Sequence, residues 1–236
     1  MKGGKTFRRW FRPLLLVIAT GFFVSLYQSW IRVPANFAPW GDVELEQPPG
    51  WLARMQINSL AADPPACIAA LDRSALSYRR TPVRPIVDGC GLEAAVRPMQ
   101  SRIAYNRTFD VTCGMMAALY WYEAALQHLA VQHLGSKIVR IDQLGTYACR
   151  NVNSAASGRR SQHATANAID IAGFRLADGR RISILDDWGK DTAEARFLAA
   201  ARDEACRFFN VVLSPDYNRL HANHFHLDLG GFRMCR

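Results

Sequence analysis

The stretch Asn167–Leu185, NAIDIAGFRLADGRRISIL, has the clearest strand pattern in the chain. Apolar residues alternate with other residues on both sides of the ADG triplet at 177–179, and a glycine in that place suits a tight turn. We therefore predict a β-hairpin here. Three further segments predict strands that accompany it, namely KIVRI (137–141), NVVLSP (210–215) and HFHLDLG (224–230).

Helices are predicted both before and after this hairpin. The strongest is Asp110–Gly135, DVTCGMMAALYWYEAALQHLAVQHLG, which has an Asp or Thr cap at its start and a glycine at its end. Shorter helices are expected at 64–76, where two prolines open the segment, and at about 192–209. Strands and helices do not alternate as parallel βαβ units do. We expect one α+β domain with a mostly antiparallel sheet and helices packed on one side.

The N-terminus has the composition of a membrane anchor. A basic segment, residues 1–12, precedes PLLLVIATGFFVSLYQSWI at 13–31, which contains no charged residue. At about 1.5 Å per residue, such a helix spans a bilayer core of roughly 30 Å. The basic flank favours a cytoplasmic N-terminus and export of the rest. A cleaved signal peptide is the alternative, although the apolar run is long for one. The expected organisation is a cytoplasmic segment (1–12), a transmembrane anchor (13–31), a tether (32–60) and a domain (61–236).

The positive charge of the chain is concentrated before the domain. The formal net charge is +9, but six of the 29 Lys and Arg residues lie within residues 1–32, which contain no acid. The exported part is therefore only slightly basic, and we expect no nucleic-acid partner. The Arg–Arg pairs at 79–80, 159–160 and 180–181 are expected to be solvated loop charges, with contact to an anionic polymer as the alternative.

All six cysteines lie beyond the predicted anchor, and their number is even. Both facts favour an oxidising compartment and up to three disulfides. Free buried thiols and a thiolate metal site are the alternatives, although the chain has no CxxC pair. The sequence does not choose among the possible pairings of Cys67, Cys90, Cys113, Cys149, Cys206 and Cys235.

The histidines are concentrated in HANHFHLDL, His221–Leu229. In an extended strand, His224, His226 and Asp228 point to one face, whereas the apolar residues between them point to the core. An ordinary surface strand would show the same pattern. A second segment, SQHATANAIDIAGF at 161–174, adds His163 and Asp170. Two histidines and one aspartate form the three-ligand set, with an open position, that catalytic zinc requires.

These motifs resemble those of known families. SQHATANAID is similar to the S-x-H-x-x-G-x-A-x-D pattern of D-Ala-D-Ala carboxypeptidases, and HANHFH matches the H-x-x-H-x-H ending of penicillin-insensitive murein endopeptidases. Both belong to the zinc peptidases grouped with lysostaphin and the hedgehog domain. TYACR, SQHATANAIDIAGF, LSPDYN and HANHFHLDL resemble the bacterial extensin-like C-terminal domain, over roughly Ala66–Arg236.

The resemblance implies a role for each candidate residue. Zinc would be held by His163, Asp170 and His226, and His224 would be the catalytic imidazole. Arg150 is our candidate for holding a substrate carboxylate or the developing oxyanion, because guanidinium offers a fork of donors. A structural arginine beside Cys149 is the alternative. The remaining candidates are His221 as a supporting or substrate-contacting residue and Asp228 as a residue that orients one imidazole. Ser161 is expected to orient the metal loop or bind substrate, and a simple cap hydroxyl is the alternative.

Two features depart from the carboxypeptidase pattern. Ala166 stands in the place of its glycine, which suggests another backbone path in the loop. The glutamate that serves these enzymes as a base has no clear counterpart in this chain. The histidine-based murein endopeptidases are therefore the better mechanistic comparison.

The resemblance implies a zinc-dependent peptidoglycan peptidase, either an endopeptidase or a carboxypeptidase. The chain would be a single-pass protein of the bacterial inner membrane, with its domain in the periplasm and a protein activator as a further possible partner. A non-catalytic, zinc-containing wall-binding or scaffolding domain is the main alternative. A disulfide-stapled interaction domain without metal is another, and His and Asp ligands also suit other divalent metals.

Overall fold

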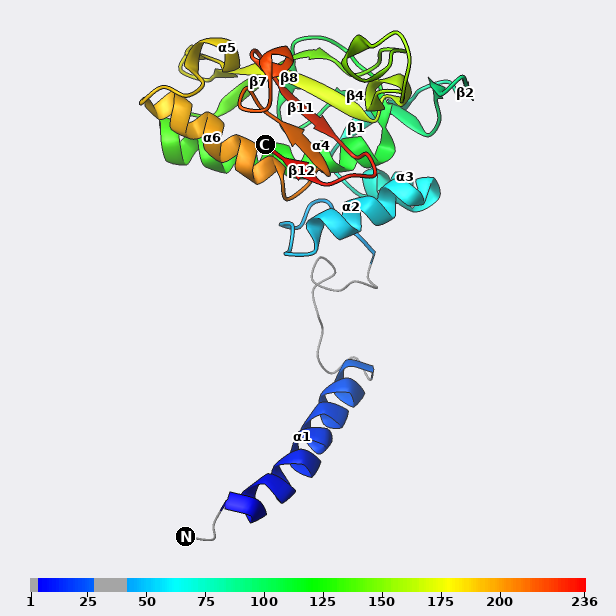
Figure 1. The fold of residues 1–236 in the computed structure, drawn as a ribbon, viewed down its shortest axis with the longest axis vertical. Helices are drawn as coiled ribbons and strands as arrows, with labels where there is room; N and C mark the ends of the chain where they lie inside the picture. The colour runs from blue at the N-terminus through cyan, green and yellow to red at the C-terminus, as the bar shows by residue number, and fades with distance from the viewer. Residues whose placement is uncertain (1–3, 28–41) are drawn as a thin grey trace.

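The computed structural model of the protein describes residues 4–27 and 42–236. Helix α1 (Gly4–Tyr27) includes most of the predicted anchor, whose last residues, 28–31, lie outside the described part (Figure 1). Within residues 4–27 and 42–236, we find no helix whose length and apolar character would allow it to cross a membrane.

A seven-stranded sheet forms the centre of the domain (Figure 1). The spatial order is β12-β10-β11-β8-β7-β5, with β9 paired to β8. Adjacent strands are antiparallel, apart from the parallel pairs β5–β7 and β10–β12. The sequence prediction of a single α+β domain with a mostly antiparallel sheet is confirmed. The bounds are β5 (Ala104–Tyr105), β7 (Ile138–Gly145), β8 (Ala168–Leu176), β9 (Arg181–Ser183), β10 (Val211–Leu213), β11 (Phe225–Asp228) and β12 (Met234–Cys235).

The hairpin that the alternating pattern predicts is formed by β8 and β9, which pair antiparallel. The turn closes with a hydrogen bond from the Leu176 N–H to the Arg180 carbonyl, at 2.9 Å. Along β8, Ile169 and Ile171 are fully buried, whereas Asp170 between them lies on the opposite face. This alternation gives the sheet one apolar face for the core and one face for polar side chains.

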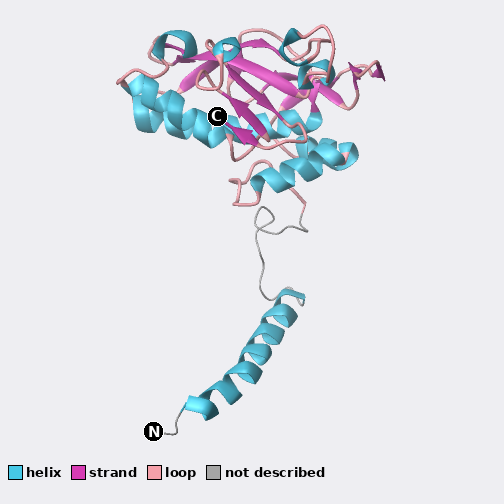
Figure 2. Cartoon of the chain, in the orientation of Figure 1, coloured by secondary structure: helices cyan, strands magenta, loops and turns pink. Residues whose placement is uncertain are grey.

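Helices cover the apolar face of the sheet (Figure 2). Helix α4 (Cys113–Leu134) begins after Thr112, whose hydroxyl accepts a hydrogen bond from the Met115 N–H, and ends at Gly135 in a left-handed conformation. Both predicted caps are thus confirmed. Helix α6 (Ala193–Ala205) packs beside α4, and the Tyr122 hydroxyl of α4 donates to the Ala201 carbonyl at 3.0 Å. A short helix, α5 (Ile184–Asp187), follows β9.

Two more helices pack against α4, of which the first lies mostly within the predicted tether and the second was predicted as a helix. They are α2 (Ala53–Ala62) and α3 (Pro64–Asp72). Val43, Leu45 and Ile57 are buried in the main core, and the Trp121 indole N–H donates to the Leu45 carbonyl at 3.1 Å. The folded domain therefore begins near residue 43 and not near residue 61. Proline-rich flanks conceal these few apolar residues from a search for periodic patterns.

Two small sheets complete the domain, and one of them contacts α4. One consists of β1 (Ser77–Arg80), β4 (Ala95–Gln100) and β6 (Val111–Thr112), and the other is the hairpin of β2 (Arg84–Val87) and β3 (Cys90–Leu92). All six cysteines form disulfides, so the predicted number of three is confirmed. The pairs are Cys67–Cys113, Cys90–Cys149 and Cys206–Cys235. They join α3 to α4, the β2–β3 hairpin to the loop after β7, and the end of α6 to β12.

A carboxyl group is buried in the core at Glu123 of α4. It accepts hydrogen bonds from the Ser101 hydroxyl, the Ile103 N–H and the Tyr105 hydroxyl. Burial raises the pKa of Glu123 to about 7, because these hydrogen bonds offset only part of the cost of removing the charge from water.

This burial makes the stability of the domain depend on pH. The folded pKa of Glu123 lies above the ordinary value of 4.5, so its stabilising contribution is complete below pH 4.5 and is lost as the pH rises through about 7. The loss is on the order of 3 kcal/mol. Glu123→Gln has no ionisable group at this position. The free energy of unfolding of the variant, relative to that of the parent, should therefore be higher at pH 8 than at pH 5. Urea denaturation at both pH values measures this gain. Glu93→Gln, at an exposed site, is the control, and a gain of the same size in both variants would contradict the assignment.

Candidate metal centre

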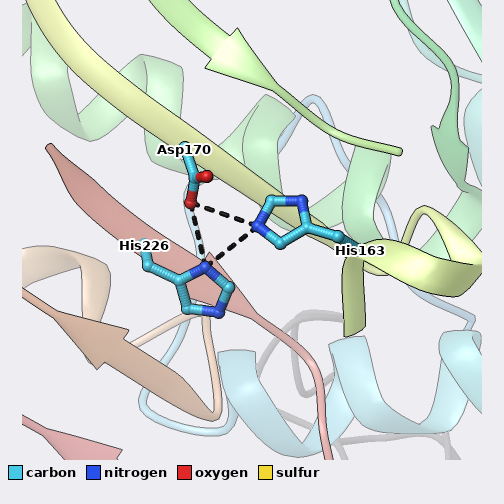
Figure 3. A group of neighbouring side chains, drawn as sticks. All are labelled: His163, Asp170 and His226. Atoms are coloured by element: carbon cyan, nitrogen blue, oxygen red, sulfur yellow. Dashed lines mark hydrogen bonds and ion pairs between the residues drawn. The ribbon is translucent and has the colours of Figure 1, made fainter. Parts of the chain in front are cut away.

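Three predicted ligands meet on the polar face of the sheet (Figure 3). Asp170 of β8 lies directly opposite His226 of β11 in the antiparallel register, and His163 comes from the 3₁₀ turn η3 (Gln162–Thr165) just before β8. The Asp170 Oδ1 atom lies 2.9 Å from His226 Nδ1 and 3.2 Å from His163 Nε2, and the two nitrogens are 3.1 Å apart. Strand pairing and one turn are therefore sufficient to bring together residues 63 positions apart in the chain.

The outer nitrogen of each imidazole also has a partner. His163 Nδ1 lies 3.2 Å from the Thr146 carbonyl, which can only accept, so Nδ1 carries the proton and Nε2 offers its lone pair to the centre. His226 Nε2 lies 2.9 Å from Asp228 Oδ2, and the other oxygen of Asp228 accepts from the Gly230 N–H at 2.7 Å. Metal-binding histidines generally have such partners, because these fix the ring and its tautomer. Two imidazole nitrogens and one carboxylate oxygen are also donors that zinc accepts.

The charges of the cluster are strongly coupled. Burial alone would raise the pKa of Asp170, but hydrogen bonds and charge attraction from His163 and His226 hold it well below its usual range. Burial opposes the charge on His226 as well, yet hydrogen bonds to Asp170 and Asp228 raise its pKa to about 9. The centre thus favours an anionic carboxylate and a positive charge beside it. A bound divalent cation would supply that positive charge in place of the proton on His226.

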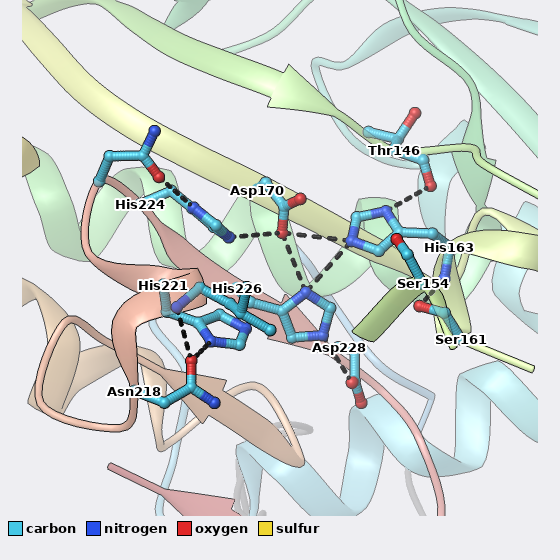
Figure 4. A network of polar contacts seen from close by, with 12 residues as sticks. Thr146, Ser154, Ser161, His163, Asp170, Asn218, His221, His224, His226 and Asp228 are labelled. Atoms are coloured by element: carbon cyan, nitrogen blue, oxygen red, sulfur yellow. Dashed lines mark hydrogen bonds and ion pairs between the residues drawn. The ribbon is translucent and has the colours of Figure 1, made fainter. Parts of the chain in front are cut away.

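Two more histidines border the centre (Figure 4). His224 Nε2 lies 3.6 Å from Asp170 Oδ1, while its Nδ1 lies 2.8 Å from the Asn223 side-chain oxygen. His221, in the turn η4 (Arg219–His221), is bound in the same way by the Asn218 side-chain oxygen at 2.8 Å. Burial lowers the pKa of both histidines, that of His221 to about 4. Both rings are therefore neutral near pH 7, with Nε2 free to accept a proton.

A cavity of about 150 Å³ opens beside His163 and His226, between the 150–163 loop and the C-terminal strands. Arg150 lines it, and its guanidinium donates to the Ser154 hydroxyl at 3.3 Å. Arg159 and Arg160 line it too. Arg159 is exposed, as predicted for a loop charge, but the prediction missed its place at the cavity. No pattern in the sequence shows that this loop folds back over the metal-site face.

Comparison with protein families identifies the domain. Residues 65–236 match the family described as Extensin-like protein C-terminus. The chain belongs to this family. No curated protein and no solved structure matches the chain. The proposed relation of the extensin-like domain to zinc peptidases thus depends on the short motifs and on the site geometry.

Ser161 and Ala166 shape the turn that holds His163 in the extensin-like domain. The Ser161 hydroxyl accepts from the His163 N–H at 3.3 Å, so it caps η3. Ala166 ends the turn in the left-handed region, with φ at 54°. This conformation is the one that glycine adopts readily. Alanine at this position therefore does not require another backbone path, contrary to the expectation from the sequence.

Asp228 of the extensin-like domain should be necessary for tight metal binding. In Asp228→Asn, one amide cannot accept from both the His226 Nε2–H and the Gly230 N–H, because one end of the amide is a donor. We expect the affinity for zinc to fall about 10–100-fold. Competition with a chromophoric chelator measures it. Asp191→Asn, at a fully exposed carboxylate, is the control. An affinity equal to that of the control would show that Asp228 does not orient His226.

Proposed function

We propose that this extensin-like domain is a zinc-dependent peptidase of peptidoglycan, acting on peptide stems or cross-links as an endopeptidase or a carboxypeptidase. The observation that supports this proposal best is the convergence of His163, Asp170 and His226, whose ligand atoms all lie within 4.8 Å of one another. Two unligated imidazoles and a cavity lie beside them. A purely structural zinc site normally has four protein ligands and no such opening.

The donors of the cluster fit zinc and leave a fourth position for substrate or water. His163 would bind through Nε2, His226 through Nδ1 and Asp170 through its carboxylate. Zinc bound in this way supplies a Lewis acid, which lowers the pKa of a water molecule to about 7 and polarises the scissile carbonyl.

The remaining residues supply proton transfer and positioning. His224 is neutral near pH 7 and presents Nε2 to the centre, so it can accept the proton of the attacking water and then return it to the leaving amine. Arg150 is our candidate for binding the carboxylate at the reacting end of the substrate or the oxyanion. His221, whose ring centroid lies 5.2 Å from that of His224, supports it and faces the cavity.

The expected compartment of the domain indicates its substrate. The charge-free segment 13–31, behind a basic flank, favours a single-pass anchor in the bacterial inner membrane, with the domain in the periplasm. Three disulfides suit that oxidising compartment. Peptidoglycan peptides are the polymer substrate that such a domain would meet there. A protein activator is a further possible partner.

The test uses the full-length protein in mild detergent, loaded with zinc and incubated with purified peptidoglycan. Mass spectrometry of the released fragments, with and without chelator, gives the bond that is cut. Cleavage that stops with chelator and returns when zinc is restored supports the proposal. Stoichiometric zinc without released fragments would favour the alternative, a non-catalytic wall-binding or scaffolding domain. Protein purified without chelator that contains no metal would favour a metal-free interaction domain.

A further inference from the structure

Arg159 has an unusual environment for an exposed arginine beside a metal centre. Its guanidinium lies over the ring of Phe232, with the central carbon 4.3 Å from the ring centroid. Within residues 4–27 and 42–236, its side chain has no hydrogen-bond acceptor and no acidic partner. Stacking on an aromatic face orients a guanidinium while leaving its N–H groups free to donate. Arg159 is thus held in position for an acceptor that the domain itself does not provide.

The cavity has two chemically different walls. The 150–163 loop contributes three arginines, Arg150, Arg159 and Arg160, while β10 and β12 contribute the apolar side chains of Val211, Leu213 and Met234. The cavity would therefore suit a ligand with a short aliphatic portion on one side and negative charge on the other. A peptide with free carboxylates has both of these features.

The positive charge of the arginine wall is not neutralised by the domain. Arg160 donates to the Asp88 carbonyl at 2.8 Å and to the Asn151 side-chain oxygen, and Arg150 donates to the Ser154 hydroxyl. All of these acceptors are uncharged. Asp228 is the one acid among the described residues that line the cavity. Its two carboxylate oxygens already form hydrogen bonds, one with His226 and one with the Gly230 N–H. An incoming carboxylate would thus meet no competing anion at Arg159.

We propose that Arg159, stacked on Phe232, is a specificity-determining residue that binds a second free carboxylate of the substrate. The substrate class is then a peptide with two carboxylates, one at the reacting end near Arg150 and one at Arg159. The aliphatic part between them lies along the apolar wall. This inference depends on the proposed peptidase function for its substrate, but the binding preference can be measured without turnover.

The experiment uses two synthetic stem tetrapeptides that differ in one group. One contains D-glutamate with its free α-carboxylate, and the other contains D-isoglutamine, in which that carboxylate is a carboxamide of nearly the same shape. Binding to the zinc-loaded, full-length protein is measured by calorimetry, and cleavage in the same samples by mass spectrometry. The parent should bind the carboxylate peptide about tenfold more tightly or better, as expected for charge-assisted hydrogen bonds.

Variants of Arg159 and Phe232 show whether the binding preference needs the forked hydrogen-bond donors of a guanidinium or only a positive charge. Arg159→Gln should bind the two peptides equally, Arg159→Lys should keep part of the preference, and Phe232→Leu should weaken it by loosening the guanidinium. Arg181→Gln is the matched control, because it removes the same charge at an exposed site outside the cavity and should keep the full preference.

The outcomes distinguish this inference from the proposed function. Equal binding of both peptides by the parent would overturn the inference, and so would a full preference in Arg159→Gln. Cleavage of both peptides with no preference would leave the peptidase proposal standing and reject the role of Arg159. Preferential binding without any cleavage would support the carboxylate site and count against the peptidase.

Discussion

His226→Ala is expected to release the metal and abolish hydrolysis. In the proposed zinc site, His226 supplies one of three protein donors, and its Nδ1 atom lies within 3.1 Å of the other two. A three-ligand zinc site has no spare protein ligand to replace it. The substitution also removes the charge partner of Asp170, whose carboxylate is largely buried. We expect stoichiometric zinc in the parent and close to none in the variant after dialysis.

Metal analysis of dialysed protein measures this effect, and peptidoglycan digestion measures the loss of hydrolysis. His128→Ala is the matched control, because His128 lies exposed on α4 and is not one of the residues of the cluster. Circular dichroism of both proteins in chelator establishes whether the variant retains the fold. A folded His226→Ala protein that keeps full zinc would remove His226 from the ligand set.

Local patterns in the sequence were sufficient for the elements that position the centre. Alternation in β8 and β11 places Asp170 and His226 on the face opposite the apolar residues, and antiparallel pairing sets them side by side. The caps of α4 follow from Thr112 and Gly135. These predictions succeed because each depends on neighbours only a few positions away.

Features that depend on packing between distant parts of the chain could not be predicted from local sequence patterns. The pairing of Cys90 with Cys149 spans 59 residues, and it holds the β2–β3 hairpin to the loop that bears Arg150. The contact of Arg159 with Phe232 likewise joins two irregular segments. Loops lack a periodic pattern, so their positions follow from the completed fold. The Arg–Arg pair at 159–160 is visible in the sequence, but a pair of charges does not show on which face its loop lies.

His224→Ala should separate metal binding from turnover. The His224 Nε2 atom lies 3.6 Å from Asp170 Oδ1, and His224 is not one of the three residues of the proposed ligand set. We therefore expect the variant to keep most of its zinc. Loss of the proton acceptor should lower kcat by about 10²–10⁴-fold and leave KM nearly unchanged.

A second substitution tests whether His224 acts through proton transfer or through shape. His224→Gln preserves polarity and a similar size but has no titratable group, so its kcat should be as low as that of the alanine variant. His221, with a pKa of about 4, is too weak a base to replace His224 fully. If His224→Gln retains the kcat of the parent while His221→Ala loses it, then His221 is the base. Loss of zinc from both His224 variants would instead make His224 a ligand, and the assignment of three protein donors would need revision.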